Sequence, residues 1–167
     1  RSNKKALEVK GIKAKEISEA FLLLILGQLK EGGRAVVCMP KAFSFRGGST
    51  KALRKRIVED YCLEAIIDVP KNAYDYISNI GCDIYVIKNK KPSPQSRTIY
   101  FNLNISEKDT DKTLDWQFGT TEMVMAQVSD LRSMMAGDAA PEMTHSQYTL
   151  INNDYDFSIK PWAGFDV

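Results

Sequence analysis

Residues 29–40 read LKEGGRAVVCMP, and this stretch decides the fold class. Its first residues complete a helical pattern, and Gly32 and Gly33 then permit a tight reversal of the chain. A short apolar run, residues 34–39, follows and is closed by Pro40. We interpret this run as a strand buried on both faces, which is typical of a parallel sheet covered by helices. The sequence therefore predicts an α/β fold.

The helix before this turn is predicted over residues 16–30. Apolar residues recur there at helical spacing and define the face that we expect to be buried. Ser18 is a candidate N-cap for this helix. The residues of the expected buried face are Ile17, Phe21, Leu24, Ile25 and Leu29.

Further helices and strands are predicted along the rest of the chain. A helix from Ser49 or Thr50 to residue 60 precedes strands over 63–69, 82–88 and 98–103, and a last helix is expected around 121–135. No helix separates the strands at 63–69 and 82–88, so we expect this pair to be antiparallel. Strands that are separated by helices imply right-handed crossovers and parallel pairing.

The composition is that of a globular protein, with 44% hydrophobic and 26% charged residues among 167. No apolar run approaches the roughly 18 residues of a membrane helix, and no secretion signal is recognisable. Three scattered cysteines and one histidine argue against a disulfide framework and a zinc site. We therefore expect a cytoplasmic protein with no metal site and no membrane contact.

The basic residues are unevenly distributed, although the net charge is only +2. Residues 41–56 contain six basic residues and no acidic residue, which indicates an anionic partner on one face. The alternative is an ordinary solvated surface. The candidate phosphate contacts, which would position DNA without reading its sequence, are Lys41, Arg46, Lys51, Arg54 and Lys55.

The order of these segments resembles the methylation (M) subunits of type I restriction–modification systems, which are adenine-N6 DNA methyltransferases. The resemblance covers most of residues 16–90 and a short stretch near the end. It is carried by SEAF at 18–21, LKEGGRAVVCMP at 29–40, the Gly47-Gly48 loop with Leu53-Arg54-Lys55, LEAIIDVPKNAY at 63–74, and NNDYDFSI at 152–159.

This resemblance implies a partial Rossmann-like class I methyltransferase sheet. The chain would supply the later strands, mostly parallel with one antiparallel strand, with helices packed on the sheet and a C-terminal extension. Residues 1–105 would form the C-terminal half of the methyltransferase domain. Residues 106–167 would form the extension, a candidate contact with other subunits.

Two site residues follow from the resemblance. Tyr74 lies where the family places an aromatic residue, usually Phe, that stacks on the target base after it leaves the duplex. Phe21 lies on a helix that borders the pocket of the methyl donor, S-adenosylmethionine. The alternative for Tyr74 is a loop tyrosine packed on its own strand, and the alternative for Phe21 is an ordinary core residue.

Two motifs of the family are missing from the sequence. There is no glycine-rich donor loop after a strand, and there is no Asn/Asp-Pro-Pro-Tyr/Phe tetrapeptide, since the chain has no Pro-Pro pair. The resemblance thus implies an active parent adenine methyltransferase and a fragment that is inactive alone. Its expected partners are double-stranded DNA and the specificity and restriction subunits of the same system.

Two other functions stay open at this point. The chain could be a non-catalytic scaffold or DNA-contact module derived from such a methyltransferase. It could also be an unrelated nucleotide-binding α/β protein, although no phosphate-binding glycine loop is present. The aromatic tail could contact another protein or pack on its own domain; its aromatic residues are Tyr148, Tyr155, Phe157, Trp162 and Phe165.

Overall fold

The computed structural model describes residues 8–9, 11–69, 81–103, 115–141 and 143–159, with the side chains of 8–9 and 115–121 left out. The elements are β1 (Glu8–Val9), β2 (Ile12–Lys13), α1 (Ile17–Gln28), β3 (Arg34–Pro40), the 3₁₀ helix η1 (Lys41–Ser44), α2 (Ser49–Asp60), β4 (Cys62–Val69), β5 (Cys82–Lys88), β6 (Arg97–Asn102), α3 (Asp115–Ala136), β7 (Thr144–Ser146) and α4 (Gln147–Asn152). The predicted helices and strands are thus present in the predicted order.

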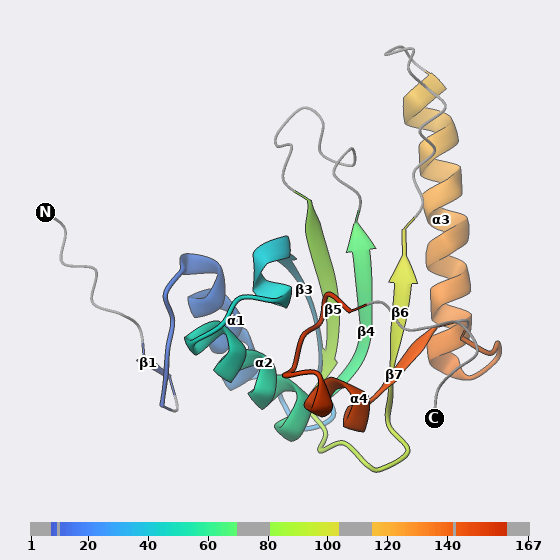
Figure 1. Cartoon of the computed structure of the whole chain (residues 1–167). Coiled ribbons are helices and arrows are strands. Elements are labelled where there is room, and N and C mark those ends of the chain that lie inside the picture. Colours follow the sequence, from blue (N-terminus) through green and yellow to red (C-terminus); the bar gives the residue numbers. More distant parts are fainter. Residues whose placement is uncertain (1–7, 10, 70–80, 104–114, 142, 160–167) are drawn as a thin grey trace, which may run out of the picture.

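The main sheet has five strands in the order β3-β5-β4-β6-β7 (Figure 1). The antiparallel pairing of β4 with β5 confirms the prediction. Strands β3, β4 and β6 run in one direction, but β5 lies between β3 and β4 and is antiparallel to both. Within the described sheet the parallel neighbours are therefore β4 and β6, and β7 is a second antiparallel strand that the sequence did not predict.

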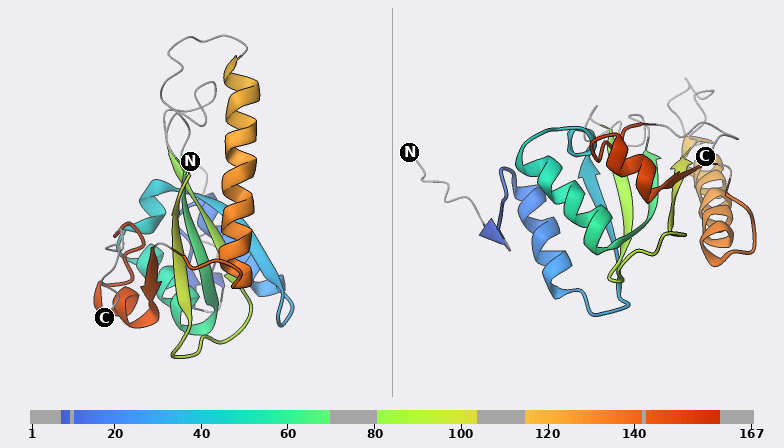
Figure 2. Two further views of the ribbon diagram at one scale, coloured as in Figure 1. Left: turned by 90° about the vertical axis from the view of Figure 1, so that its right-hand side faces the viewer. Right: turned by 60° about the horizontal axis from the view of Figure 1, so that its bottom comes forward.

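Helices cover both faces of this sheet. Helices α1, α2 and α4 pack on one face, and α3 packs on the other, so the sheet stands between two layers (Figure 2). Alternate residues of β5 divide accordingly: Tyr85 and Ile87 belong to the larger core, and Val86 belongs to the smaller core under α3. This arrangement confirms the predicted α/β class.

The buried face predicted for α1 is wrong. The expected core residues Ile17 and Phe21 are 75% and 61% exposed, whereas Leu22, Leu23 and Leu26 are buried in the larger core. The cause is that this helix is apolar on nearly all sides, so that spacing alone cannot select its packed face. The N-cap is Glu16, with no side-chain cap, and Ser18 lies inside the helix.

Strand β3 is buried on one face, contrary to the prediction of two buried faces. Ala35, Val37 and Met39 face the larger core, whereas Val36 is 66% exposed and Cys38 is exposed. The cause is the position of β3 at the edge of the described sheet, because the smaller core under α3 is built on β4, β5 and β6. Val36 and Cys38 therefore lie open on the face of β3 opposite to the one on which α1 packs.

The turn before β3 uses its glycines as expected. Gly32 has a φ of +73°, a conformation that residues with a side chain rarely adopt. A Cβ atom on Gly33 would lie 2.9 Å from the carbonyl oxygen of Lys30, so a side chain would not fit there.

Two aromatic residues of the tail pack on the domain itself. Phe157 is 1% exposed and lies against Phe43 and Tyr85, and the Phe157 N–H donates to the carbonyl of Ser44 at 2.9 Å. Tyr155 is also buried, whereas Tyr148 is 71% exposed. For Tyr155 and Phe157 the structure therefore decides between the two open alternatives. Trp162 and Phe165 lie outside the described residues.

Within the described ranges, no helix is both long and apolar enough to cross a lipid bilayer.

Candidate functional site

The carboxyl ends of β3, β4 and β6 lie at one edge of the sheet, at the top of Figure 1. Lys41 comes directly after β3, and Asp68 lies next to the last residue of β4. Asp83 lies near the start of β5, directly opposite Asp68 in the antiparallel register. This edge is where open α/β sheets bind their ligands.

A charged cluster is built at this edge from three elements. The Lys41 ammonium donates to Oδ1 of Asp83 at 2.5 Å and also to Oδ1 of Asp68. Tyr85 donates to the second oxygen of Asp83, and Tyr100 donates to the second oxygen of Asp68, each at 3.4 Å. We call Lys41, Asp68, Asp83, Tyr85 and Tyr100 the edge cluster. One cation is shared by two carboxylates, each backed by a tyrosine hydroxyl.

Burial and charge act in opposite directions within the edge cluster. Burial raises the pKa of Asp83 above its usual value, and the hydrogen bond from Lys41 offsets this only in part. Burial lowers the pKa of Lys41, but its hydrogen bonds to Asp68 and Asp83 outweigh burial and leave this pKa raised. The two directions are compatible, because Lys41 interacts with two carboxylates whereas the buried Asp83 shares a single cation. Burial also raises the pKa of both tyrosines, so their hydroxyls stay protonated donors.

The raised pKa of Asp83 predicts a pH-dependent stability. A group whose pKa is higher in the folded state contributes its full stability below its unfolded pKa, and this contribution is lost as pH rises through the folded pKa. Wild type should therefore gain free energy of unfolding relative to Asp83→Asn as pH falls from 7 to 4. Urea denaturation of both chains at several pH values measures this difference. Asp60→Asn, a change at the exposed end of α2, is the control, and a pH-independent difference for Asp83→Asn would contradict the assignment.

The structure places most of the predicted phosphate contacts in ion pairs. Lys41 belongs to the edge cluster, Arg46 pairs with Glu16, and Lys51 pairs with Asp154 at 2.8 Å. Lys55 is exposed on α2. Arg46, Lys51 and Lys55 lie on or just before α2, so they remain close enough to serve one surface. Contact with DNA at these residues stays a prediction.

Arg54 lies in the interior, and this position does not fit the predicted phosphate contact. Its side chain is 2% exposed, and its guanidinium donates to the carbonyls of Tyr155, Phe43 and Arg46, each at 2.7 Å. The guanidinium also lies 6.0 Å from the ring centre of Phe157. Burial lowers the pKa of Arg54. The reason for the difference is that Arg54, like Leu53, lies on the inner side of α2. The number of basic residues in a segment does not show which of them face the interior.

The structure describes only one of the two residues assigned from the resemblance. Phe21 is exposed on the outer side of α1, where it could form one wall of a pocket but does not enclose one. Tyr74 lies in 70–80, outside the described residues, so its stacking role stays a prediction.

Asp68 and Asp83 were missed in the sequence, although a signal was present. Asp68 lies near the end and Asp83 near the start of a mostly apolar strand, in LEAIIDVP and CDIYVIK. An acidic side chain is rarely buried unless it is paired. Such a position therefore predicts a partner at the sheet edge.

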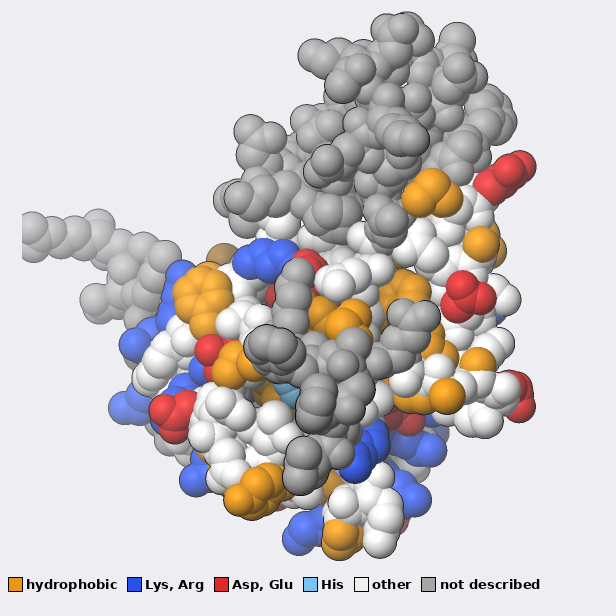
Figure 3. Space-filling model, turned by 45° about the vertical axis from the view of Figure 1, so that its right-hand side comes forward, with side chains coloured by type: hydrophobic (Ala, Val, Ile, Leu, Met, Phe, Trp, Pro, Cys, Tyr) orange, Lys and Arg blue, Asp and Glu red, His pale blue; other side chains and the backbone are white. Residues whose placement is uncertain are grey.

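A groove of about 660 Å³ lies between β6 and α3, next to the edge cluster. Its lining includes Tyr100, Phe101, Leu103, Asp130, Met134 and Met143. Along the α3 side, acidic and hydrophobic side chains are both exposed (Figure 3). Among the residues that the structure describes, no three His, Cys, Asp or Glu side chains lie together as a metal ion would require.

A comparison with protein families finds the family described as N-6 DNA Methylase, whose model matches residues 3–163. The chain belongs to the N-6 DNA methylase family. The match includes the described sheet, the edge cluster and the packed part of the C-terminal tail. It therefore covers most of the elements that build the site.

Solved structures show the same fold as this N-6 DNA methylase chain. A chain from a study of complex assembly and conformational transition of the type I R-M system matches with a TM-score of 0.68 and 16% identity, over 93% of this chain and 35% of that one. The type I methyltransferase subunit from Streptococcus thermophilus matches with a TM-score of 0.66 and 18% identity, over 90% and 32%. A modification subunit of a putative type I restriction enzyme from Vibrio vulnificus matches with a TM-score of 0.64 and 15% identity, over 83% and 29%.

The N-6 DNA methylase chain thus spans about a third of the length of the structures that it matches. The family match confirms the resemblance to adenine-N6 DNA methyltransferases that the sequence showed. It also confirms the class I methyltransferase fold implied by that resemblance.

Proposed function

We propose that this chain is the later part of the methyltransferase domain of a type I M subunit, which transfers a methyl group from S-adenosylmethionine to N6 of adenine in double-stranded DNA. The observation that carries the proposal is the family match over residues 3–163. The division into residues 1–105, which finish the sheet, and 106–167, which extend it, is part of this proposal.

The open surfaces of the described fold support this assignment. Ile17, Phe21, Leu24 and Ile25 of α1 are exposed, and Val36 of β3 is exposed on the opposite face of the sheet. The pairing of β3 with β5 uses one of its sides, so the other is open to a further strand within the described sheet. A sheet portion that carries a glycine-rich donor loop would pair and pack there.

The roles of the residues follow from this arrangement. Tyr74 would stack on the target adenine after it leaves the duplex, and Phe21 would border the donor. S-adenosylmethionine supplies the methyl group when it is bound, chiefly by residues that this sequence does not contain. Arg46, Lys51 and Lys55 would contact DNA phosphates without reading the bases. The partners would be the specificity and restriction subunits, and the reaction would take place in the cytoplasm, where the DNA is.

A second candidate is a non-catalytic scaffold or DNA-contact module. The observation that favours it is the lack of both the donor loop and the Asn/Asp-Pro-Pro-Tyr/Phe tetrapeptide in this sequence. Reading the encoding gene upstream of Arg1 separates the two candidates. A donor loop and the tetrapeptide there support the enzyme, and a reading frame without them leaves the scaffold.

Methyl transfer provides the direct test. We expect the full-length protein, together with its specificity subunit, to transfer tritiated methyl groups from S-adenosylmethionine to duplex DNA. The 167-residue chain alone should transfer none and should show no saturable donor binding in calorimetry. Activity of the chain alone would show that the donor site lies within it, and an inactive full-length complex would favour the scaffold.

A further inference from the structure

The edge cluster joins three segments that are far apart in the sequence. Lys41 belongs to η1, which follows β3, whereas Asp68 and Asp83 belong to β4 and β5. The side chains of Asp83, Asp68 and Lys41 are 7%, 24% and 33% exposed. The cluster is therefore partly closed from water, which strengthens its ion pairs relative to pairs on the open surface.

The two aspartates of the edge cluster lie on either side of residues 70–80, which connect β4 to β5. Asp68 lies two residues before 70–80, and Asp83 lies three residues after it. Because the two aspartates are register partners, the connection leaves and re-enters the sheet at adjacent points. The ammonium of Lys41 ties both points to the end of β3.

Further contacts hold the same points. The Leu103 N–H donates to the backbone carbonyl of Asp68 at 3.0 Å, so the end of β6 is attached to the same residue. The Ser44 hydroxyl donates to the backbone carbonyl of Lys41 at 2.7 Å, which fixes η1 below the ammonium. With its charge neutralised by two carboxylates, Lys41 is poorly suited to a DNA phosphate.

We propose that Lys41 is a positioning residue for methyl transfer: by bridging Asp68 and Asp83, it fixes the two strand ends that carry the connection bearing Tyr74. The inference rests on the proposed function. Without the bridge, two carboxylates face each other in a half-buried space and repel. The ends of β4 and β5 then separate, and the connection that bears Tyr74 loses its fixed attachment points. A displacement of this kind can lower a rate up to a hundredfold.

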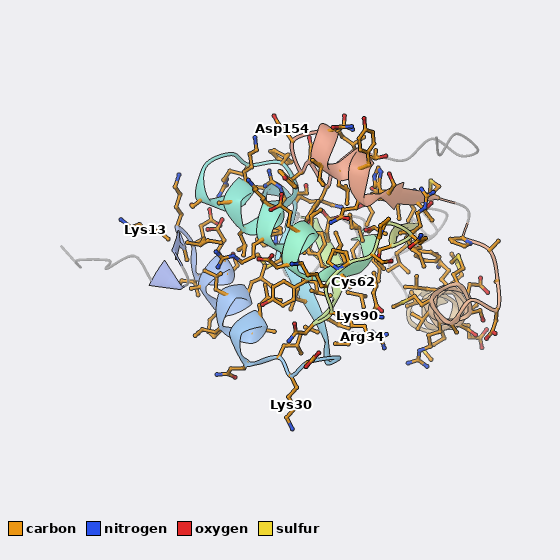
Figure 4. The ribbon with its side chains drawn as sticks, turned by 90° about the horizontal axis from the view of Figure 1, so that it is seen from below. Lys13, Lys30, Arg34, Cys62, Lys90 and Asp154 are labelled. Atoms are coloured by element: carbon orange, nitrogen blue, oxygen red, sulfur yellow. The ribbon has the colours of Figure 1, made fainter. Side chains whose placement is uncertain are left out.

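The test uses the full-length methyltransferase with its specificity subunit and five variants, one of which combines Lys41→Met with Tyr74→Ala. Lys41→Met removes the cation, Lys41→Arg keeps it and can still contact both carboxylates, and Tyr74→Ala removes the stacking ring. Lys30→Met is the matched control, because Lys30 is exposed, projects outward from the molecule (Figure 4) and precedes β3, whereas Lys41 follows the other end of that strand. The probe is a duplex with 2-aminopurine at the target adenine, whose fluorescence lifetimes distinguish stacked from unstacked base.

We expect Lys41→Met to lower kcat about tenfold or more, with KM for DNA and for S-adenosylmethionine changed less than about twofold. Its lifetimes should shift toward those of Tyr74→Ala, and Lys41→Arg should recover most of the rate. The double variant should be no slower than Tyr74→Ala alone, because both changes act through the same stacking step. Lys30→Met should behave as wild type.

Three results would overturn the inference while leaving the proposed function intact. One is wild-type kcat in Lys41→Met. Another is a multiplicative loss in the double variant with unchanged lifetimes, which indicates a structural role only. The third is a raised KM for DNA with a shallower salt dependence, which indicates a phosphate contact. An inactive wild-type complex overturns the proposed function as well.

Discussion

Arg54→Ala should lower the free energy of unfolding of the 167-residue chain by about 3–5 kcal/mol, among the largest losses for a single substitution. The guanidinium satisfies three backbone carbonyls at 2.7 Å, those of Phe43, Arg46 and Tyr155. Alanine would leave the buried carbonyls of Phe43 and Tyr155 and the partly buried carbonyl of Arg46 without their donor, and a buried acceptor that is left unsatisfied costs about 1–3 kcal/mol. The measurement is urea denaturation followed by circular dichroism.

Two further variants show whether the loss arises from these hydrogen bonds. Arg54→Lys keeps the charge, but a single ammonium cannot reproduce the planar fork, so it should recover only a minor part of the loss. Lys55→Ala, the exposed neighbour on α2, should change stability by less than about 0.5 kcal/mol. Equal small effects for Arg54→Ala and Lys55→Ala would show that Arg54 does not hold the tail in place.

Tyr74→Ala in the full-length methyltransferase should lower kcat on duplex DNA by roughly ten- to a hundredfold, while the melting temperature changes little. The reason is that a base that leaves the helix loses its stacking partners, and an aromatic ring restores about 1–3 kcal/mol. Steady-state kinetics with tritiated S-adenosylmethionine and differential scanning fluorimetry measure the two quantities.

Tyr74→Phe is the matched control for this prediction, because it keeps the ring and removes only the hydroxyl. It should retain most of the wild-type rate. Full activity in Tyr74→Ala would remove Tyr74 from the site. A loss of the same size in Tyr74→Phe would instead assign the effect to the hydroxyl rather than to stacking.

Most of the fold could be predicted from the sequence because apolar runs and glycines act locally. The run at 34–39, the turn at Gly32 and the antiparallel pair at 63–69 and 82–88 depend on neighbouring residues only, and the structure contains all three. The packed face of α1 could not be predicted, because a helix that is apolar on nearly all sides offers several equivalent faces. Which one is buried depends on α1's contact with β3, a tertiary fact.

The site was less predictable for the same reason. Charge counting placed Lys41 and Arg54 on a surface, but their partners come from β4, β5 and the tail, up to 101 positions away in the sequence. The stacking role of Tyr74 was predicted from the family resemblance. The residues around Tyr74 predicted only that it lies in a loop. The edge cluster required knowledge of the register that places Asp68 opposite Asp83.

The position of β3 at the edge of the described sheet has a consequence for how the proposed methyltransferase can be assembled. In the described sheet β3 has a strand neighbour on one side only, and an edge strand with exposed apolar side chains favours pairing with another polypeptide. We therefore expect two separately synthesised pieces of the proposed methyltransferase to associate noncovalently along the edge of β3. The same edge strand would make either piece prone to aggregation when the other piece is absent.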